Sequence, residues 1–271
     1  MIPAAFDYVR AESVDHAVAL LGEHGDDAKL IAGGHSLLPM MKLRLAFPSV
    51  LVDVRTIAEA SYVRVDGDVV AVGALTRHRD LVTSDVLRAE APLIAMAAAY
   101  VGDPQIRNRG TIGGSLAHAD PAADLPAAVL ASDATLVVQC ADGRREIASG
   151  EFFTGYFETA LDDSEMLVEI RVPRTGANGA HYEKFTRRAN DWAIVGVATV
   201  AGRVALANMG SAPLRATAVE AALAEGASVD DAAALAAENT SPVADMNADA
   251  VYRKHLARVL TRRALSAAVG V

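Results

Sequence analysis

The first part of the chain has the hydrophobic spacing of one helix and two short strands. Behind Ser13, which can cap a helix, apolar residues recur at helical intervals, at Ala17, Val18, Leu20 and Leu21. Gly25 is suited to end this helix. Two short and mostly apolar runs, 29–31 and 50–54, then predict buried strands. The pattern therefore indicates a small α/β unit that ends near residue 56.

The middle of the chain alternates between strand and helix patterns. Residues 62–65 and 69–72 predict a β-hairpin, because two valine-rich runs flank a two-residue Asp-Gly turn. Thr76 is placed to cap a helix that carries Leu81. The other predicted segments are a helix from Pro92 to about Val101, a loop over 103–109, a helix over 125–131, and strands over 134–140 and 167–172.

The last part has the pattern of a separate domain. Residues 173–179 have the proline and glycine content of a linker. The segments that follow predict three antiparallel strands and then three helices, at 182–186, 192–200, 204–208, 214–225, 229–238 and 249–268. We therefore predict an α/β and α+β fold in three parts, residues 1–56, 57–176 and 177–271. The third would hold a three-stranded antiparallel sheet with a helix bundle.

Composition narrows the classes of function. The 271 residues include 25 Lys and Arg against 34 Asp and Glu, a formal net charge of −9, which disfavours a nucleic-acid binder. The one cysteine, Cys140, allows neither an internal disulfide nor a four-cysteine iron–sulfur cluster from this chain. No secretory signal and no run long enough for a membrane span is visible. We expect a cytoplasmic protein.

Two glycine pairs carry the candidate chemistry. Residues 32–39 read AGGHSLLP and residues 111–126 read TIGGSLAHADPAADLP, about 80 residues further on. Glycine pairs permit positive φ and close approach of a ligand, and successive N–H groups in such turns form nests for phosphate. Ser36, Thr111 and Ser115 add hydroxyls. Two nests predict a pyrophosphate held from two sides, as in FAD, although each pair could also be a simple connecting turn. Neither stretch matches a Rossmann or P-loop motif.

The two stretches together resemble the FAD-binding subunit of the molybdenum hydroxylases, a family that includes xanthine dehydrogenases and aerobic carbon monoxide dehydrogenases. The likeness extends from residues 6–8 to 252–256, and the run HSLLPMMK at 35–42 is most similar to the medium subunit of carbon monoxide dehydrogenases. The resemblance implies a two-part FAD-binding domain, a C-terminal flavoprotein domain, and FAD held without a covalent link.

The resemblance also implies the cofactor-binding residues. It places Asp124 along the ribityl chain, Leu167 and Lys184 beside the flavin ring, and Val101 near the ring or the adenine. Trp192 would flank or gate the ring, with packing in the core as the alternative. His35 and His118 would donate to phosphate or backbone. The full predicted set is Ala32, Gly33, Gly34, His35, Ser36, Leu37, Val101, Thr111, Ile112, Gly113, Gly114, Ser115, His118, Asp124, Leu167, Lys184 and Trp192.

The implied function is electron transfer. FAD would take electrons from the clusters of a small iron–sulfur subunit and pass them to an external acceptor, while a large molybdenum-cofactor subunit carries out the substrate chemistry. No catalytic residue and no metal ligand is assigned to this chain. Two alternatives stay open from the residues alone. One is a self-contained flavin oxidase, and the other is a nucleotide-binding or assembly protein without redox activity.

Overall fold

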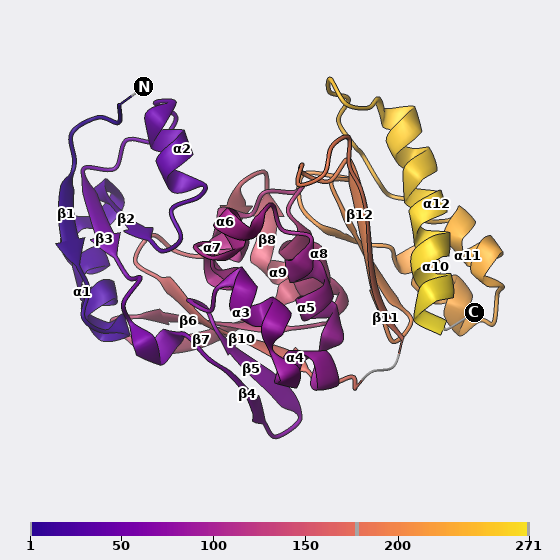
Figure 1. Cartoon of the computed structure of the whole chain (residues 1–271), viewed down its shortest axis with the longest axis horizontal. Coiled ribbons are helices and arrows are strands. Elements are labelled where there is room, and N and C mark those ends of the chain that lie inside the picture. The colour runs from indigo at the N-terminus through magenta and orange to yellow at the C-terminus, as the bar shows by residue number, and fades with distance from the viewer. Residues whose placement is uncertain (1, 177–178, 270–271) are drawn as a thin grey trace.

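The computed structural model describes residues 2–176 and 179–269. Three sheets follow one another along the longest axis of the molecule, each with its own helices (Figure 1). The first is parallel, in the order β1-β3-β2, and is formed by β1 (Asp7–Arg10), β3 (Val50–Asp53) and β2 (Ala28–Ile31). Strand β1 was not predicted. Its sequence, DYVR, is mostly exposed and lacks an apolar run.

Helix α1 (Val14–His24) covers this first sheet and has the predicted ends. The Ser13 side chain accepts the His16 N–H, and Gly25, at φ 54°, donates its own N–H to Leu21 O. The chain continues through a short 3₁₀ turn (Gly25–Asp27) into β2, and then into α2 (Leu37–Lys42). A second 3₁₀ turn (Ala58–Ala60) leads out of this part.

The middle sheet has five antiparallel strands in the order β4-β5-β10-β6-β7. The strands are β4 (Val63–Asp66), β5 (Val69–Gly73), β10 (Met166–Pro173), β6 (Thr135–Cys140) and β7 (Gly143–Ala148). Its helices are α3 (His78–Thr83), α4 (Asp85–Glu90), α5 (Pro92–Ala99), α6 (Pro104–Arg107), α7 (Ile112–His118), α8 (Asp124–Ala131) and α9 (Ser149–Phe152). A small hairpin, β8 (Phe153–Gly155) with β9 (Glu158–Thr159), completes this part.

Three local predictions in this part are wrong. Thr76 does not cap α3; its hydroxyl bonds the backbone N–H and carbonyl of Tyr62 instead, and the helix begins two residues later. Helix α5 ends at Ala99 rather than near residue 101. The predicted loop over 103–109 contains α6, because Asp103 accepts the Ile106 N–H and proline occupies the first helical position.

The last sheet is antiparallel, in the order β11-β12-β13-β14. Its strands are β11 (Ala180–Phe185), β12 (Val195–Val200), β13 (Arg203–Ala207) and the two-residue β14 (Leu214–Arg215), which is one strand more than predicted. Helices α10 (Thr217–Ala224), α11 (Val229–Ala234) and α12 (Ala250–Val269) cover one face (Figure 1). Residues 177 and 178 of the predicted linker lie outside the described residues, and the three-part division stays a prediction.

The hydrophobic core explains why the last two sheets lie close together. Tyr182, Ala198 and Ala205 from the last sheet are buried in the same cluster as α5, α7 and α8 of the middle part. The other face of the last sheet packs against α10, α11 and α12. Helices α5 and α8 are therefore buried between two sheets. No helix in the described part of the chain combines the length and apolar character needed to cross a membrane.

Candidate functional site

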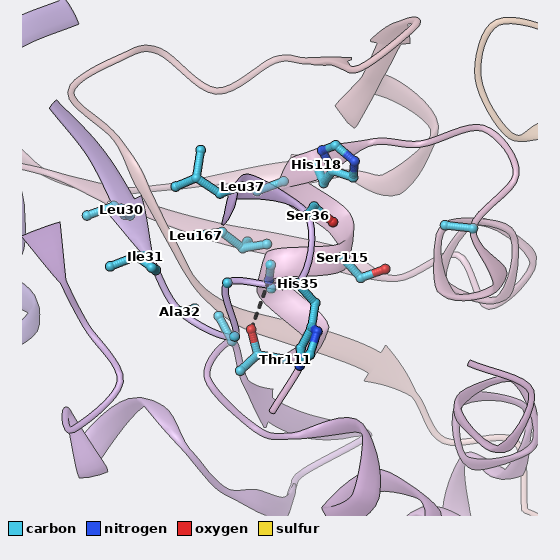
Figure 2. Close-up of a pocket in the computed structure, with 18 of the residues that line it drawn as sticks. Leu30, Ile31, Ala32, His35, Ser36, Leu37, Thr111, Ser115, His118 and Leu167 are labelled. Atoms are coloured by element: carbon cyan, nitrogen blue, oxygen red, sulfur yellow. Dashed lines mark hydrogen bonds between the residues drawn. The ribbon is translucent and has the colours of Figure 1, made fainter. Parts of the chain in front are cut away.

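A cavity of about 810 Å³ is lined by residues from all three predicted parts. This volume lies in the upper part of the range of roughly 300–1,000 Å³ typical of small-molecule and cofactor sites. Ile112 does not line the cavity, because it is fully buried in the core. The predicted residues that do line it are Ala32, Gly33, Gly34, His35, Ser36, Leu37, Val101, Thr111, Gly113, Gly114, Ser115, His118, Asp124, Leu167, Lys184 and Trp192. Figure 2 shows side chains from both glycine stretches, with Leu167, around this space.

The turn between β2 and α2 has the geometry of an anion nest. Gly34 has φ +74°, which favours glycine. Among residues 2–176 and 179–269, no protein acceptor receives the N–H groups of residues 33–37. Successive free N–H groups in a tight turn are the arrangement that binds phosphate oxygens. Gly33 is needed for a second reason. A Cβ on it would lie 2.6 Å from Gly110 Cα and 2.7 Å from Arg109 O, so the turn packs directly on another backbone segment.

The second predicted nest, at Gly113 and Gly114, is wrong. Neither glycine has positive φ, because both lie in the first turn of α7, which Thr111 caps. The first three N–H groups of the helix are already bonded, at 2.8–3.1 Å, to Thr76 O, Ala74 O and Thr111 Oγ1 (the last is the dashed line in Figure 2). They are not free to hold a phosphate.

The glycines of α7 are explained by close packing instead. A Cβ on Gly113 would lie 2.6 Å from Ala74 Cβ, so glycine lets the helix contact the end of β5. A Cβ on Gly114 would meet only Thr111 Oγ1, at 2.9 Å. Because Gly114 has no side chain, a ligand in the cavity can approach the backbone of α7 at this residue.

Asp124, Tyr182 and Lys184 form a buried polar cluster at the cavity. Tyr182 Oη donates to Asp124 Oδ1 at 2.7 Å, and Lys184 Nζ donates to Asp124 Oδ2 at 3.0 Å and to Tyr100 O at 3.1 Å. The side chains of Asp124 and Lys184 are each only 4% exposed. Burial raises the pKa of Asp124, and the Lys184 charge and the Tyr182 hydrogen bond oppose that rise.

This cluster changes the interpretation of Asp124. Both of its oxygens already accept from the protein, so its first task is to hold Lys184 in place, and any ligand hydroxyl would be an additional donor. Burial and the neighbouring carboxylate raise the pKa of Tyr182 well above its usual value, so the phenol remains protonated and donates. Lys184 uses two of its three N–H donors on Asp124 and Tyr100, which leaves one for the cavity.

The two remaining aromatic candidates, Trp192 and His118, line the cavity with an exposed and a half-buried side chain, respectively. Trp192 is 58% exposed, which excludes the alternative that it packs in the core. The His118 ring packs against Phe157, with ring centroids 5.1 Å apart. Burial lowers the pKa of His118, and the Asp120 charge opposes that change. Trp192 can therefore cover a planar ligand from the solvent side, and the His118 ring is held in the cavity wall by Phe157.

Comparison with known proteins identifies the family of this chain and its cofactor. A model of the FAD binding domain in molybdopterin dehydrogenase matches residues 4–175, and one of the CO dehydrogenase flavoprotein C-terminal domain matches residues 180–268. The chain belongs to this flavoprotein family. FAD is therefore its cofactor, and the chain is the flavoprotein component of an oxidoreductase. The free amides of residues 33–37 and the buried lysine suit a ligand with a diphosphate and a ring that becomes more negative on reduction.

The flavoprotein has similar relatives along its whole length. The carbon monoxide dehydrogenase medium chain of Hydrogenophaga pseudoflava is 43% identical, over 99% of this chain and 98% of that protein. The 6-hydroxypseudooxynicotine dehydrogenase complex subunit alpha of Paenarthrobacter nicotinovorans is 40% identical over 99% and 96%. In a solved structure of the H. pseudoflava carbon monoxide dehydrogenase, one chain matches with a TM-score of 0.95 at 45% identity, covering 100% of this chain and 99% of that chain.

The sequence interpretation missed several lining residues. His78 lines the cavity from the start of α3, and Leu30 and Ile31 line it from β2. Nothing local marks His78, because its place depends on contacts with residues more than thirty positions away. Tyr182 could have been found. It lies two residues before Lys184 on a strand, so both side chains project from the same face and reach the same carboxylate.

Proposed function

We propose that this chain is the electron-transfer subunit of a molybdenum hydroxylase complex. FAD, when bound, supplies chemistry that both accepts and donates electrons. The observation that carries the proposal is the cavity itself, which combines free amides at one turn with a buried lysine held by a carboxylate. The chain has one cysteine, so the iron–sulfur clusters that would supply electrons belong to another subunit.

Each part of the cavity has a separate task in this proposal. The amides of residues 33–37 bind the diphosphate, and the small residues at α7 let the cofactor lie against that helix. Lys184 favours extra negative charge near the ring, because a buried cation acts strongly where water is excluded. Asp124 and Tyr182 position the lysine. Trp192 covers the ring from the solvent side and limits access of solvent to it. The flavin is held without a covalent bond.

The proposed partners are a small iron–sulfur subunit and a large molybdenum-cofactor subunit, together with an external electron acceptor, in a cytoplasmic complex doubled by two-fold symmetry. Carbon monoxide is the favoured substrate, since the medium chains of carbon monoxide dehydrogenase from H. pseudoflava and Afipia carboxidovorans are 43% and 39% identical to this chain. The relative from P. nicotinovorans, at 40%, acts on another substrate by its name, so the substrate needs a direct test.

Anaerobic reduction of the flavin tests this proposal. The complex purified from the native cell is mixed with carbon monoxide, and the visible flavin absorbance is followed. We expect bleaching in the complex and none in the separated chain supplied with FAD. Reduction of the separated chain by a small organic substrate would support the self-contained oxidase instead. A chain that holds nucleotide but never shows flavin absorbance would support the non-redox alternative.

A further inference from the structure

His78 is a buried histidine at the cavity that the proposed function does not use. It begins α3, is 4% exposed, and lines the cavity. Its backbone N–H donates to Gly110 O at 3.0 Å. The Nε2–Cδ2 edge of its ring faces Gly110 closely, since a Cβ on that glycine would lie 2.8 Å from both atoms. His78 and Gly110 both line the cavity, and of the two ring nitrogens only Nδ1 is fully buried without a partner, so the Nε2 edge is the one that can reach the ligand space.

The opposite side of the ring fixes where the proton lies. Nδ1 of His78 is fully buried and has no hydrogen-bond partner among the described residues. A neutral imidazole carries its proton on one nitrogen only. An unpaired buried acceptor is tolerated more often than an unpaired buried N–H. The favoured tautomer therefore keeps the proton on Nε2, the nitrogen beside Gly110.

The edge that carries this proton lies next to the phosphate turn. Gly110 is the residue against which Gly33 packs, with no room for a Cβ between them. The Nε2–H, Gly110 and the free amides of residues 33–37 therefore converge from three chain segments. A donor placed beside five free amides adds to their positive potential and is suited to an anionic oxygen.

Burial and the neighbouring positive groups keep the His78 imidazole neutral when no anion is present. Burial, and to a smaller extent the nearby charges of His35 and Arg107, lower the pKa of His78 to about 4. Helix α5, which packs on α3, carries no charged residue. The other charged groups on neighbouring segments are Arg77, Arg79, Asp80, Asp103 and Arg109. An added phosphate would be the dominant negative charge beside the ring and would favour protonation.

We propose that His78 is a phosphate-facing residue of the FAD cavity that takes up a proton when the diphosphate binds. The inference rests on the proposed placement of the diphosphate at residues 33–37. The uptake makes FAD binding pH-dependent, because a ligand that raises proton binding must itself bind more tightly as the pH falls. Between about pH 5 and 7, FAD affinity is expected to fall by up to about tenfold per pH unit.

Calorimetry of FAD binding tests the proposal without any assay of activity. FAD is titrated into FAD-depleted protein, in the assembly that the native cell yields, in buffers of different ionisation enthalpy, so that the protons taken up are counted. We expect uptake of a fraction of one proton near pH 6. His78→Gln keeps a donor near the Nε2 position but cannot titrate, so it should abolish the uptake and weaken binding by less than about tenfold, the equivalent of 1.4 kcal/mol. His78→Leu should abolish the uptake and weaken binding further.

His35→Gln is the matched control, because His35 is the other histidine at this turn. Uptake that survives in His35→Gln but not in His78→Gln supports the assignment. Uptake that survives in His78→Gln, or equal affinity in wild type and His78→Leu, would overturn it. If His78→Leu does not fold, the His78→Gln proton count alone decides. Failure of the wild type to bind FAD at all would contradict the proposed function and is thereby distinguished from failure of this inference.

Discussion

Replacing Lys184 by methionine should destabilise the fold strongly, because it leaves the Asp124 carboxylate buried without its cation. Both side chains are only 4% exposed, and their contact distance is 3.0 Å. Removing one partner of a buried ion pair costs roughly 3–5 kcal/mol, a large part of the roughly 5–15 kcal/mol that stabilises a typical domain. Methionine keeps most of the length of lysine, so lost packing contributes little.

The exposed pair Lys29–Asp163 provides the control. Its contact distance is similar, 3.1 Å, but its side chains are 50% and 64% exposed. Lys29→Met should therefore cost only about 0–1 kcal/mol. The free energy of unfolding is measured in urea for both variants and for Lys184→Met combined with Asp124→Asn. The double variant should recover part of the loss, because the uncompensated charge is gone.

The pH dependence of the stability of Lys184→Met independently tests whether the buried Asp124 charge causes the loss. In Lys184→Met the pKa of Asp124 in the folded state rises further above its unfolded value, since burial already raises it and the opposing charge is removed. A group with a raised folded pKa stabilises the fold below its unfolded pKa and loses that contribution as the pH rises. The loss in the free energy of unfolding caused by Lys184→Met should therefore become smaller as the pH falls toward the usual pKa of a carboxyl. Equal losses in Lys184→Met and Lys29→Met, with no pH dependence, would refute the reasoning.

Three further predictions follow from the site and the fold. Gly114→Val should lower the FAD content of the purified protein more than His118→Ala does, because a side chain at Gly114 projects from the cavity wall; equal flavin content in Gly114→Val and wild type would contradict this. Acid precipitation should leave the yellow colour in the supernatant, and colour in the pellet would point to a covalent link. Burial alone would raise the pKa of Asp53, but hydrogen bonds from Arg55 and Tyr8 hold it at about 2. At pH values above its usual pKa, ionised Asp53 should therefore add about 2 kcal/mol to the free energy of unfolding. This contribution is lost as the pH falls through about 2. Asp53→Asn should flatten acid unfolding followed by circular dichroism over that range.

The hydrophobic pattern predicts an element well when the element buries one face and its ends are set by neighbouring residues. The predicted ends of α1 are confirmed, because serine and glycine act within one turn of the helix. Strand β1 shows the limit. Its residues are mostly exposed, and only pairing with β3, more than forty positions away, makes it a strand. Strand β14 has two residues, too few for any pattern to indicate.

The two glycine pairs show the same limit at the site. Both look like phosphate turns in the sequence, yet only residues 33–37 keep their amides free. In α7 the amides are used by Ala74 O, Thr76 O and the Thr111 hydroxyl, and the first two acceptors lie on a distant segment. Which amides remain available is decided by tertiary packing, so a motif can place a residue at a cavity without fixing its role there.

Sedimentation of the natively expressed protein, with flavin and metal analysis of the peak, tests the central claim most directly. The proposed electron-transfer subunit should sediment as a complex far larger than the 28.2 kDa chain, with flavin, iron and molybdenum in the same peak. A monomer that carries flavin but neither metal, and that oxidises a substrate unaided, would contradict the claim and support a self-contained flavin oxidase.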